Sequence, residues 1–160
     1  MSGKSEASRD AERIGKGREL ALFVLCHLES YPADERPEAS ALAFSAAAAE
    51  DGSGALAEIA RLRDDAAARR FAERQVGRAL SGAEEIDEAL ESTSERWRLD
   101  RMHQVDRNLL RLAAVELMHD ATPSAVVASE ATRLAGRYGS ETSARFVNGV
   151  VDALAKRLRG

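Results

Sequence analysis

The chain has 160 residues and a mass of 17.3 kDa, a length typical of one domain. Hydrophobic residues make up 44% and charged residues 31%, values close to globular averages that exclude wholesale disorder. The net charge of −4 argues against nucleic-acid binding through overall charge. No apolar run approaches the roughly 18–20 residues of a membrane-spanning helix, so no membrane partner is expected. Residues 1–18 lack an apolar core, so we expect no secretory signal and a cytoplasmic location.

Cys26 is the single cysteine, which excludes an intramolecular disulfide and a cysteine-based zinc site. It falls beside an apolar stripe, which favours a buried, inert thiol over a nucleophile. The histidines, His27, His103 and His119, are far apart and form no metal-binding spacing, and neither a phosphate-binding loop nor a dinucleotide fingerprint is present. We therefore expect no catalytic residues, no metal, no cofactor and no enzymatic activity.

Composition and charge distribution point to a helical protein with basic ends. The sequence has 31 alanines but only 3 prolines and 7 aromatic residues, which favours helices over strands. Residues 1–18 hold five basic and three acidic side chains. Residues 29–51 hold one basic and six acidic side chains, and residues 145–160 hold four basic and one acidic. This asymmetry permits a local anion-binding site, although solvated helix faces and a cationic helix C-terminus account for most of it.

The N-terminal part is expected to contain a short tail and a helix. Residues 1–11 show no apolar period and predict a flexible tail, so that the folded domain covers residues 12–160. Apolar residues stepping by three and four predict a helix over Arg13–Glu29. Gly15 and Gly17 weaken its first turn, which is expected to order on binding.

The middle of the chain gives mixed signals. Ala41–Ala49 predicts a short helix and Asp51–Gly54 a turn. Ala55–Leu80 is helical by its apolar spacing, with a break around Arg63–Asp65. Ser81–Ser92 predicts a further helix, opened by a capping box in which the serine is the N-cap and a glutamate follows three residues later.

The last third is the most regular. Val105–His119 carries one broad apolar face. Thr122 followed by Pro123 predicts a helix start, with threonine as the cap, and Gly139 predicts its end. Apolar residues from Phe146 onward predict a final helix. With no strand pattern in the sequence, the chain is expected to fold as an all-α bundle or orthogonal packing of helices.

Three segments are candidates for binding another molecule. The basic segment Arg13–Arg18 could follow a phosphate backbone. In Arg145–Gly149, the glycine suggests close approach of another backbone, and an aromatic beside an arginine could stack on a base. Periodicity alone favours the alternative, in which Phe146 is core and Asn148 a buried polar group. In Asp106–Ala113, charges flank apolar residues, which fits either an interface or ordinary helix capping.

At these segments the sequence resembles the NusB family of transcription antitermination factors. The resemblance rests on ordered groups of residues: Arg18-Glu19 followed by Ala21 and Leu25, then Trp97–Arg101, Val105–Leu117, Thr122-Pro123, Ala128–Ala131, Leu134-Ala135, Tyr138-Gly139 and Phe146–Asp152.

The resemblance implies an all-α, NusB-like fold of two small helical bundles, about seven helices in a single compact domain. It also implies a function, namely binding of the boxA element of nascent RNA together with a ribosomal small-subunit protein that acts as NusE. This complex would join the RNA polymerase elongation complex with other Nus factors and promote processive ribosomal RNA transcription. Ile14, Gly15 and Gly17 dilute the basic N-terminal run that is typical of the family.

The resemblance also assigns residues. The RNA contacts map onto the residues of the basic segment and of the start of the last helix: Arg13, Lys16, Arg18, Tyr138, Thr142, Arg145 and Phe146. The partner-facing acid maps onto Asp106, with Arg107 and Arg111 nearby. Two alternatives remain: a NusB-like regulatory module such as those attached to some ribosomal RNA methyltransferases, and a helical adapter with little or no RNA binding of its own.

Overall fold

The computed structural model describes residues 3–45, 54–93 and 96–160, and within them it contains eight α-helices, two short 3-10 helices and no strand. The all-α prediction is confirmed, with one helix more than the expected seven. The chain divides into two compact units, Met1–Gly77 (unit 1) and Arg78–Gly160 (unit 2), which confirms the expected pair of helical bundles. Within the described ranges, no helix is both long and apolar enough to cross a membrane.

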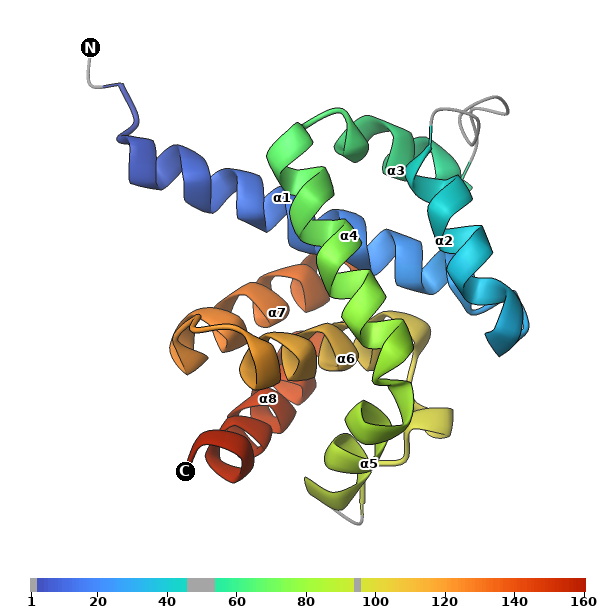
Figure 1. Ribbon diagram of the computed structural model, residues 1–160. Coiled ribbons are helices and arrows are strands. Elements are labelled where there is room, and N and C mark those ends of the chain that lie inside the picture. Colours follow the sequence, from blue (N-terminus) through green and yellow to red (C-terminus); the bar gives the residue numbers. More distant parts are fainter. Residues whose placement is uncertain (1–2, 46–53, 94–95) are drawn as a thin grey trace. The chain divides into compact units, whose positions relative to one another are not determined.

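Unit 1 is built on one long N-terminal helix (Figure 1). Its elements are α1 (Glu6–Leu28), the 3-10 helix η1 (Ala33–Glu35), α2 (Arg36–Phe44), α3 (Gly54–Arg63) and most of α4 (Ala66–Ser81). Helix α1 begins at Glu6, because the hydroxyl of Ser5 accepts a hydrogen bond from the Ser8 amide at 3.2 Å and caps it. Residues 6–11 of the expected tail are therefore helical, and the helix continues through Gly15 and Gly17.

The break predicted around Arg63–Asp65 is confirmed. Helix α3 ends at Arg63 and α4 begins at Ala66, where Asp65 Oδ1 accepts hydrogen bonds from the amides of Ala67 and Ala68, both at 3.1 Å. Helix α2 ends at Phe44, so the helix predicted over Ala41–Ala49 is displaced toward the N-terminus. Residues 46–49 and 51–53, on which the rest of that helix and most of the predicted turn fall, lie outside the described residues.

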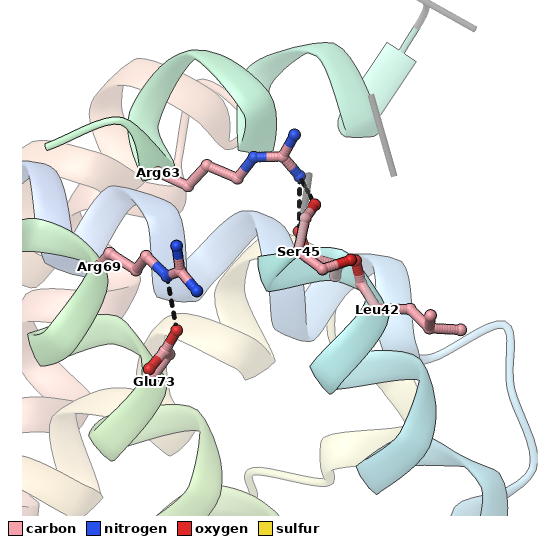
Figure 2. A network of polar contacts seen from close by, with 6 residues as sticks. Leu42, Ser45, Arg63, Arg69 and Glu73 are labelled. Carbon is pink, nitrogen blue, oxygen red and sulfur yellow. Dashed lines mark hydrogen bonds and ion pairs between the residues drawn. The ribbon is translucent and has the colours of Figure 1, made fainter. Parts of the chain in front are cut away.

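The core of unit 1 is mainly aliphatic and contains two phenylalanines, Phe44 of α2 and Phe71 of α4. Its fully or nearly buried side chains include Leu20, Leu22, Val24, Leu28, Ile59, Phe71 and Val76. A buried arginine closes the end of α2. The Arg63 guanidinium donates to the carbonyls of Ala43 (3.2 Å) and Ser45, as Figure 2 shows. Only 9% of Arg63 is exposed, so these carbonyls replace the water that its charge has lost.

Unit 2 packs three long helices against one another, with a shorter one beside them (Figure 1). Its elements are α5 (Ala83–Thr93), the 3-10 helix η3 (Leu99–Arg101), α6 (Gln104–His119), α7 (Ser124–Tyr138) and α8 (Ser143–Arg159). The apolar stripes predicted for these helices form the core, which includes Leu109, Leu110, Leu117, Val127, Leu134, Val147, Val150 and Leu154.

Two predicted helix starts are wrong in detail. Ser81 belongs to the last turn of α4, where its hydroxyl donates to the Arg78 carbonyl at 3.4 Å, so it does not cap α5. Pro123 itself is the N-cap of α7, with no side-chain cap from Thr122. The carbonyls of Gly82 and Pro123 accept the first hydrogen bonds of these helices, from Ile86 and from Val126 and Val127 respectively.

The two glycines singled out at the end of α7 and inside α8 behave differently. Gly139 ends α7 as predicted, and a Cβ there would lie 2.5 Å from Ser143 Cβ and 2.6 Å from the Ala135 carbonyl oxygen. Gly149 is exposed, and a Cβ there would meet nothing within 4 Å. The expected close approach of another backbone at Gly149 is therefore wrong for the described part of the chain.

Arg159, at the end of α8, holds the C-terminal end of α6. Its guanidinium donates to a group of carbonyl oxygens, those of Glu116 (3.3 Å), Leu117 (3.1 Å), Asp120 (2.8 Å) and Thr122 (2.6 Å). The last carbonyls of a helix lack intrahelical partners and carry partial negative charge, which suits a cation. This contact joins the C-terminal end of α8 to the C-terminal end of α6 within one bundle; both helices carry residues predicted to bind a partner or RNA.

Candidate functional site

The candidate site in unit 2 begins with an aromatic pair. The connector after α5 carries Trp97, and the first turn of α8 carries Phe146. Their rings meet edge to face, with centroids 6.3 Å apart and planes at 89°. Both side chains are half-buried, so each ring keeps part of its surface accessible to a ligand.

A groove of 240 Å³ lies beside this aromatic pair. Most of its lining comes from the connector, with one residue from the first turn of α6 and one from α8: Arg96, Trp97, Arg98, Arg101, Met102, His103, Asp106 and Phe146. Three arginines and one carboxylate thus surround two aromatic rings. Such a lining can stack a flat group and bind an anion at the same time.

Asp106 provides the groove with a buried carboxylate. The residue is 5% exposed, and among the described residues its Oδ1 has no hydrogen-bond partner. Its place in the first turn of α6 favours a negative charge there, because the helix N-terminus carries partial positive charge. An unpaired buried acceptor is costly, so a donor supplied by a ligand would be favoured at this position.

The two arginines predicted to lie near Asp106 are engaged in the bundle. Arg107 is half-buried and donates to the Met102 carbonyl at 2.5 Å, which holds the connector against the start of α6. Arg111 is paired with Asp87 of α5, with Nε 2.9 Å from Oδ1 and Nη2 3.2 Å from Oδ2. A two-point contact of this kind fixes the geometry of both side chains, so Arg111 also joins α5 to α6.

The predicted RNA contacts of unit 2 lie together around the α7–α8 loop. Tyr138 is in the last turn of α7, where the Arg137 guanidinium lies 5.1 Å from its ring centroid. Thr142 is the N-cap of α8 and is exposed, as is Arg145 one turn later. With half-buried Phe146, the loop presents a cation, a hydroxyl and two aromatic rings within one short segment.

The expectation that Asn148 is a buried polar group is wrong. Asn148 is exposed, and its Oδ1 lies 3.3 Å from the Thr132 hydroxyl of α7. The buried polar residue of this region is Ser143, at the start of α8, and its hydroxyl accepts from the Ser140 amide at 2.8 Å. This bond fixes the α7–α8 loop and hence the start of α8.

The predicted contacts of unit 1 lie along α1. Arg13 is exposed and 3.7 Å from Asp10, and Lys16 is exposed. Arg18 is half-buried, with its guanidinium 5.5 Å from the ring centroid of Phe71. Earlier in the helix, a hydrogen bond from Lys4 lowers the pKa of the Glu12 carboxyl, and the charges of Lys4 and Lys16 act in the same direction. Acidic side chains thus offset part of the positive charge on α1.

Sequence reasoning missed the cationic connector. Arg96, Arg98 and Arg101 lie close together in the sequence around a tryptophan, a local signal that could have been found. That Trp97 folds onto Phe146 is a contact between distant segments and leaves no local signal. Within the residues that the structure describes, no three histidine, cysteine or acidic side chains are placed to hold a metal ion.

Comparisons with known proteins decide the family. The NusB family model matches residues 16–156. The chain belongs to the NusB family. The transcription antitermination protein NusB of Myxococcus xanthus is 38% identical over 143 residues, which cover 89% of this chain and 94% of that protein.

Other NusB relatives match a shorter region. NusB of Anaeromyxobacter dehalogenans is 55% identical over 73 residues, which cover 46% of this chain and 51% of that protein. NusB of Sorangium cellulosum is 55% identical over 74 residues, covering 46% and 53%. The matching part of the chain thus spans about half the length of these relatives.

Solved structures share the fold. T. maritima NusB aligns with a TM-score of 0.61 and 28% identity over 88% of this chain and 90% of that one. A chain in a structure described as a crystal structure of a plectonemic RNA supercoil aligns with a TM-score of 0.66 and 24% identity, over 91% and 95%. The second likeness concerns the fold alone. Together they confirm the NusB-like fold predicted from the sequence.

Proposed function

We propose that this NusB-family chain is a transcription antitermination factor that binds boxA-type single-stranded RNA together with the ribosomal small-subunit protein acting as NusE. In this proposal the complex joins the RNA polymerase elongation complex with other Nus factors and promotes processive ribosomal RNA transcription. The chain itself acts by binding, without a cofactor, and in the cytoplasm.

The observation that carries the proposal is the groove of unit 2, where Phe146 and Asp106 line one continuous surface. The ring of Phe146 suits a base, because stacking needs an aromatic face that stays partly accessible. The buried Oδ1 of Asp106 suits a donor from a protein partner, which would satisfy an acceptor that has no partner among the described residues. The RNA and the protein partner would then bind next to each other in this groove, at Phe146 and Asp106 respectively.

The remaining predicted contacts support this division of roles. Thr142 and Arg145 are exposed at the start of α8, beside Phe146 and next to Tyr138, and can reach phosphate and sugar groups. Arg13, Lys16 and Arg18 of α1 are proposed as further phosphate contacts. Arg107 and Arg111 are proposed to act on the partner side chiefly by fixing the connector and α5 around Asp106.

The experiment is a titration of boxA-like RNA with the chain alone, with the ribosomal protein alone and with both, at several salt concentrations. If Arg13, Lys16, Arg18 and Arg145 neutralise three or four phosphates, log K falls against log salt with a slope of roughly −2 to −3. DNA of the same sequence should bind less tightly if the 2′-hydroxyl is read. A response independent of salt, or no RNA binding under any of these conditions, would exclude the proposal.

One observation favours the second candidate, a NusB-like adapter or regulatory module with little RNA binding of its own. On α1, Arg13 lies near Asp10, Arg18 is half-buried, and Gly15 and Gly17 interrupt the basic run. The titration discriminates the two readings. The adapter would bind the ribosomal protein and leave the RNA affinity of that protein unchanged.

A further inference from the structure

The two glycines that interrupt the basic run of α1 are contact positions. Gly15 and Gly17 are both buried. A Cβ on residue 17 would lie 2.7 Å from Cδ1 of Phe71 and 3.0 Å from the Ala68 carbonyl oxygen. Helix α1 therefore lies directly against α4 at Gly17 (Figure 1), where the Phe71 side chain and the Ala68 carbonyl of α4 leave no room for a side chain on residue 17. Gly17, which interrupts the basic run of α1, is thus also the residue at which α4 packs closely against α1.

At this crossing one aromatic ring holds a cation from each helix. The Arg18 guanidinium of α1 lies 5.5 Å from the centroid of Phe71, and the Arg74 guanidinium of α4 lies 5.6 Å from the same centroid. Both distances are within the range of cation–π attraction. Phe71 is 7% exposed, whereas Arg74 is exposed, so the ring anchors guanidinium groups at the surface of unit 1.

The exposed arginines of α4 outnumber the acidic side chains beside them, so this part of the helix carries a net positive charge. Arg69, Arg70 and Arg74 are all exposed, and the acid among them, Glu73, lies 2.8 Å from Arg69 (Figure 2). Arg70 forms no ion pair with any described residue. It lines a groove of 440 Å³ together with Arg63, Asp64, Ala66, Arg69 and Glu73. Arg70 and Arg74 are four residues apart on one helix face, an arrangement of like charges that costs helix stability.

We propose that Arg70 and Arg74 of α4, together with Arg18 of α1, form a phosphate-binding surface for the RNA. This inference rests on the proposed function and adds α4 to it. Arginine suits this role because its planar, multiply donating group matches phosphate oxygens. Contacts of this kind position the RNA backbone without reading its bases. The arginines of α4 thus replace the cations that the glycines and Ile14 remove from α1.

The test compares the wild-type chain with the double variant Arg70→Gln/Arg74→Gln in titrations with boxA-like RNA at several salt concentrations, with and without the ribosomal protein. We expect the affinity to fall roughly 10-fold or more, because charge-assisted hydrogen bonds are lost. The salt slope should become shallower by about 1.4, since each single-strand phosphate contact contributes about 0.7. Both variant side chains are exposed, so circular dichroism should show the helical content unchanged.

Two control variants isolate the site. Arg69→Gln/Glu73→Gln removes an ion pair from the same helix without changing the net charge. Lys156→Gln/Arg157→Gln removes two exposed cations from α8, the same change in charge as the test variant. Both controls should retain RNA affinity within about two-fold, because neither removes a proposed phosphate contact.

The outcomes are distinct. Unchanged affinity and slope in Arg70→Gln/Arg74→Gln, beside RNA binding by the wild type, overturn the inference and leave the proposed function intact. An equal loss in Lys156→Gln/Arg157→Gln overturns it in favour of net charge. Loss of ribosomal-protein binding with unchanged RNA binding overturns it in favour of a protein contact. No RNA binding by the wild type, with or without the ribosomal protein, removes the proposed function and this inference together.

Discussion

Gly17 of α1 lies so close to Phe71 of α4 that a methyl group on residue 17 would come within 2.7 Å of the ring. The backbone oxygen of Ala68 would be 3.0 Å from the same carbon, so a shift of the ring alone would not relieve the contact. A glycine inside a helix costs about 1 kcal/mol relative to alanine. At this position the cost is offset by the close packing of two helices.

The first prediction follows from this contact. Gly17→Ala should lower the free energy of unfolding by about 1–3 kcal/mol, because the added carbon forces α1 and α4 apart. Gly149→Ala is the matched control, since Gly149 also lies inside a helix but has open space where a Cβ would be. It should raise the free energy of unfolding by about 0.5–1 kcal/mol. Urea melts measure both, and equal effects would contradict the packing argument.

The second prediction concerns the contact between the end of α8 and the end of α6. Arg159→Ala removes the donor to the carbonyls of Glu116, Leu117, Asp120 and Thr122. The free energy of unfolding should fall by about 1.5–3 kcal/mol, the range for hydrogen bonds to a charged group. The control is Lys156→Ala on the same helix, which removes an exposed cation paired with Asp152 one turn away. It should change the free energy of unfolding by less than about 0.5 kcal/mol. Similar losses in both variants would show that α8 needs only positive charge near its end.

The helices of unit 2 could be predicted from the sequence because their signals are local. Apolar residues repeat along α6, α7 and α8, and Pro123 and Gly139 mark the ends of α7. The start of α1 could not be predicted in this way. Its first turns carry charged and small residues with no apolar stripe, and the helix there depends on alanine, on the Ser5 cap and on its continuation into the buried part of α1.

The candidate site was less predictable because it depends on contacts between distant segments. Gly17 and Gly149 have the same local signal, a glycine inside a helix, yet only the first has a neighbour that requires it among the described residues. Asp106 was predicted as a partner-facing acid, but it is only 5% exposed and lines the groove together with the connector residues Arg101, Met102 and His103. Local spacing on α6 cannot show what a preceding loop covers.

The third prediction concerns Asp106. Asp106→Asn keeps the shape of the side chain and removes its charge. Because Oδ1 is buried without a partner among the described residues, stability should stay within about 0.5 kcal/mol of the wild type or rise. Affinity for the ribosomal protein should fall roughly 10-fold, since a charge-assisted hydrogen bond is lost.

Asp100→Asn provides the control for Asp106, because Asp100 is an exposed acid on η3 in the same unit. Its affinity for the ribosomal protein should match that of the wild type. Calorimetric titration with the ribosomal protein, beside a thermal melt, measures both properties. If Asp106→Asn lowered the melting temperature and left the affinity unchanged, Asp106 would be a structural residue of the helix start and not a partner contact.

The last prediction separates the two roles that the sequence left open for Phe146. The ring is half-buried and packs edge-on against Trp97, so it is neither a core residue nor a free surface group. Phe146→Ala should therefore destabilise the fold by less than the roughly 3–5 kcal/mol of a fully buried phenylalanine. It should weaken RNA binding by about 1–3 kcal/mol through lost stacking, whereas Phe146→Tyr, which keeps the ring, should bind nearly as the wild type does.

Val147→Ala is the control for packing, because Val147 is the next residue along α8 and is fully buried. It should lower the free energy of unfolding and leave the RNA affinity of the folded protein unchanged, since its side chain points into the core and away from any ligand. Urea melts beside RNA titrations of the three variants give both quantities. If Phe146→Ala lost stability as a core residue does, and the folded fraction bound RNA like the wild type, the ring would serve packing alone and the groove of unit 2 would lose its base-stacking element.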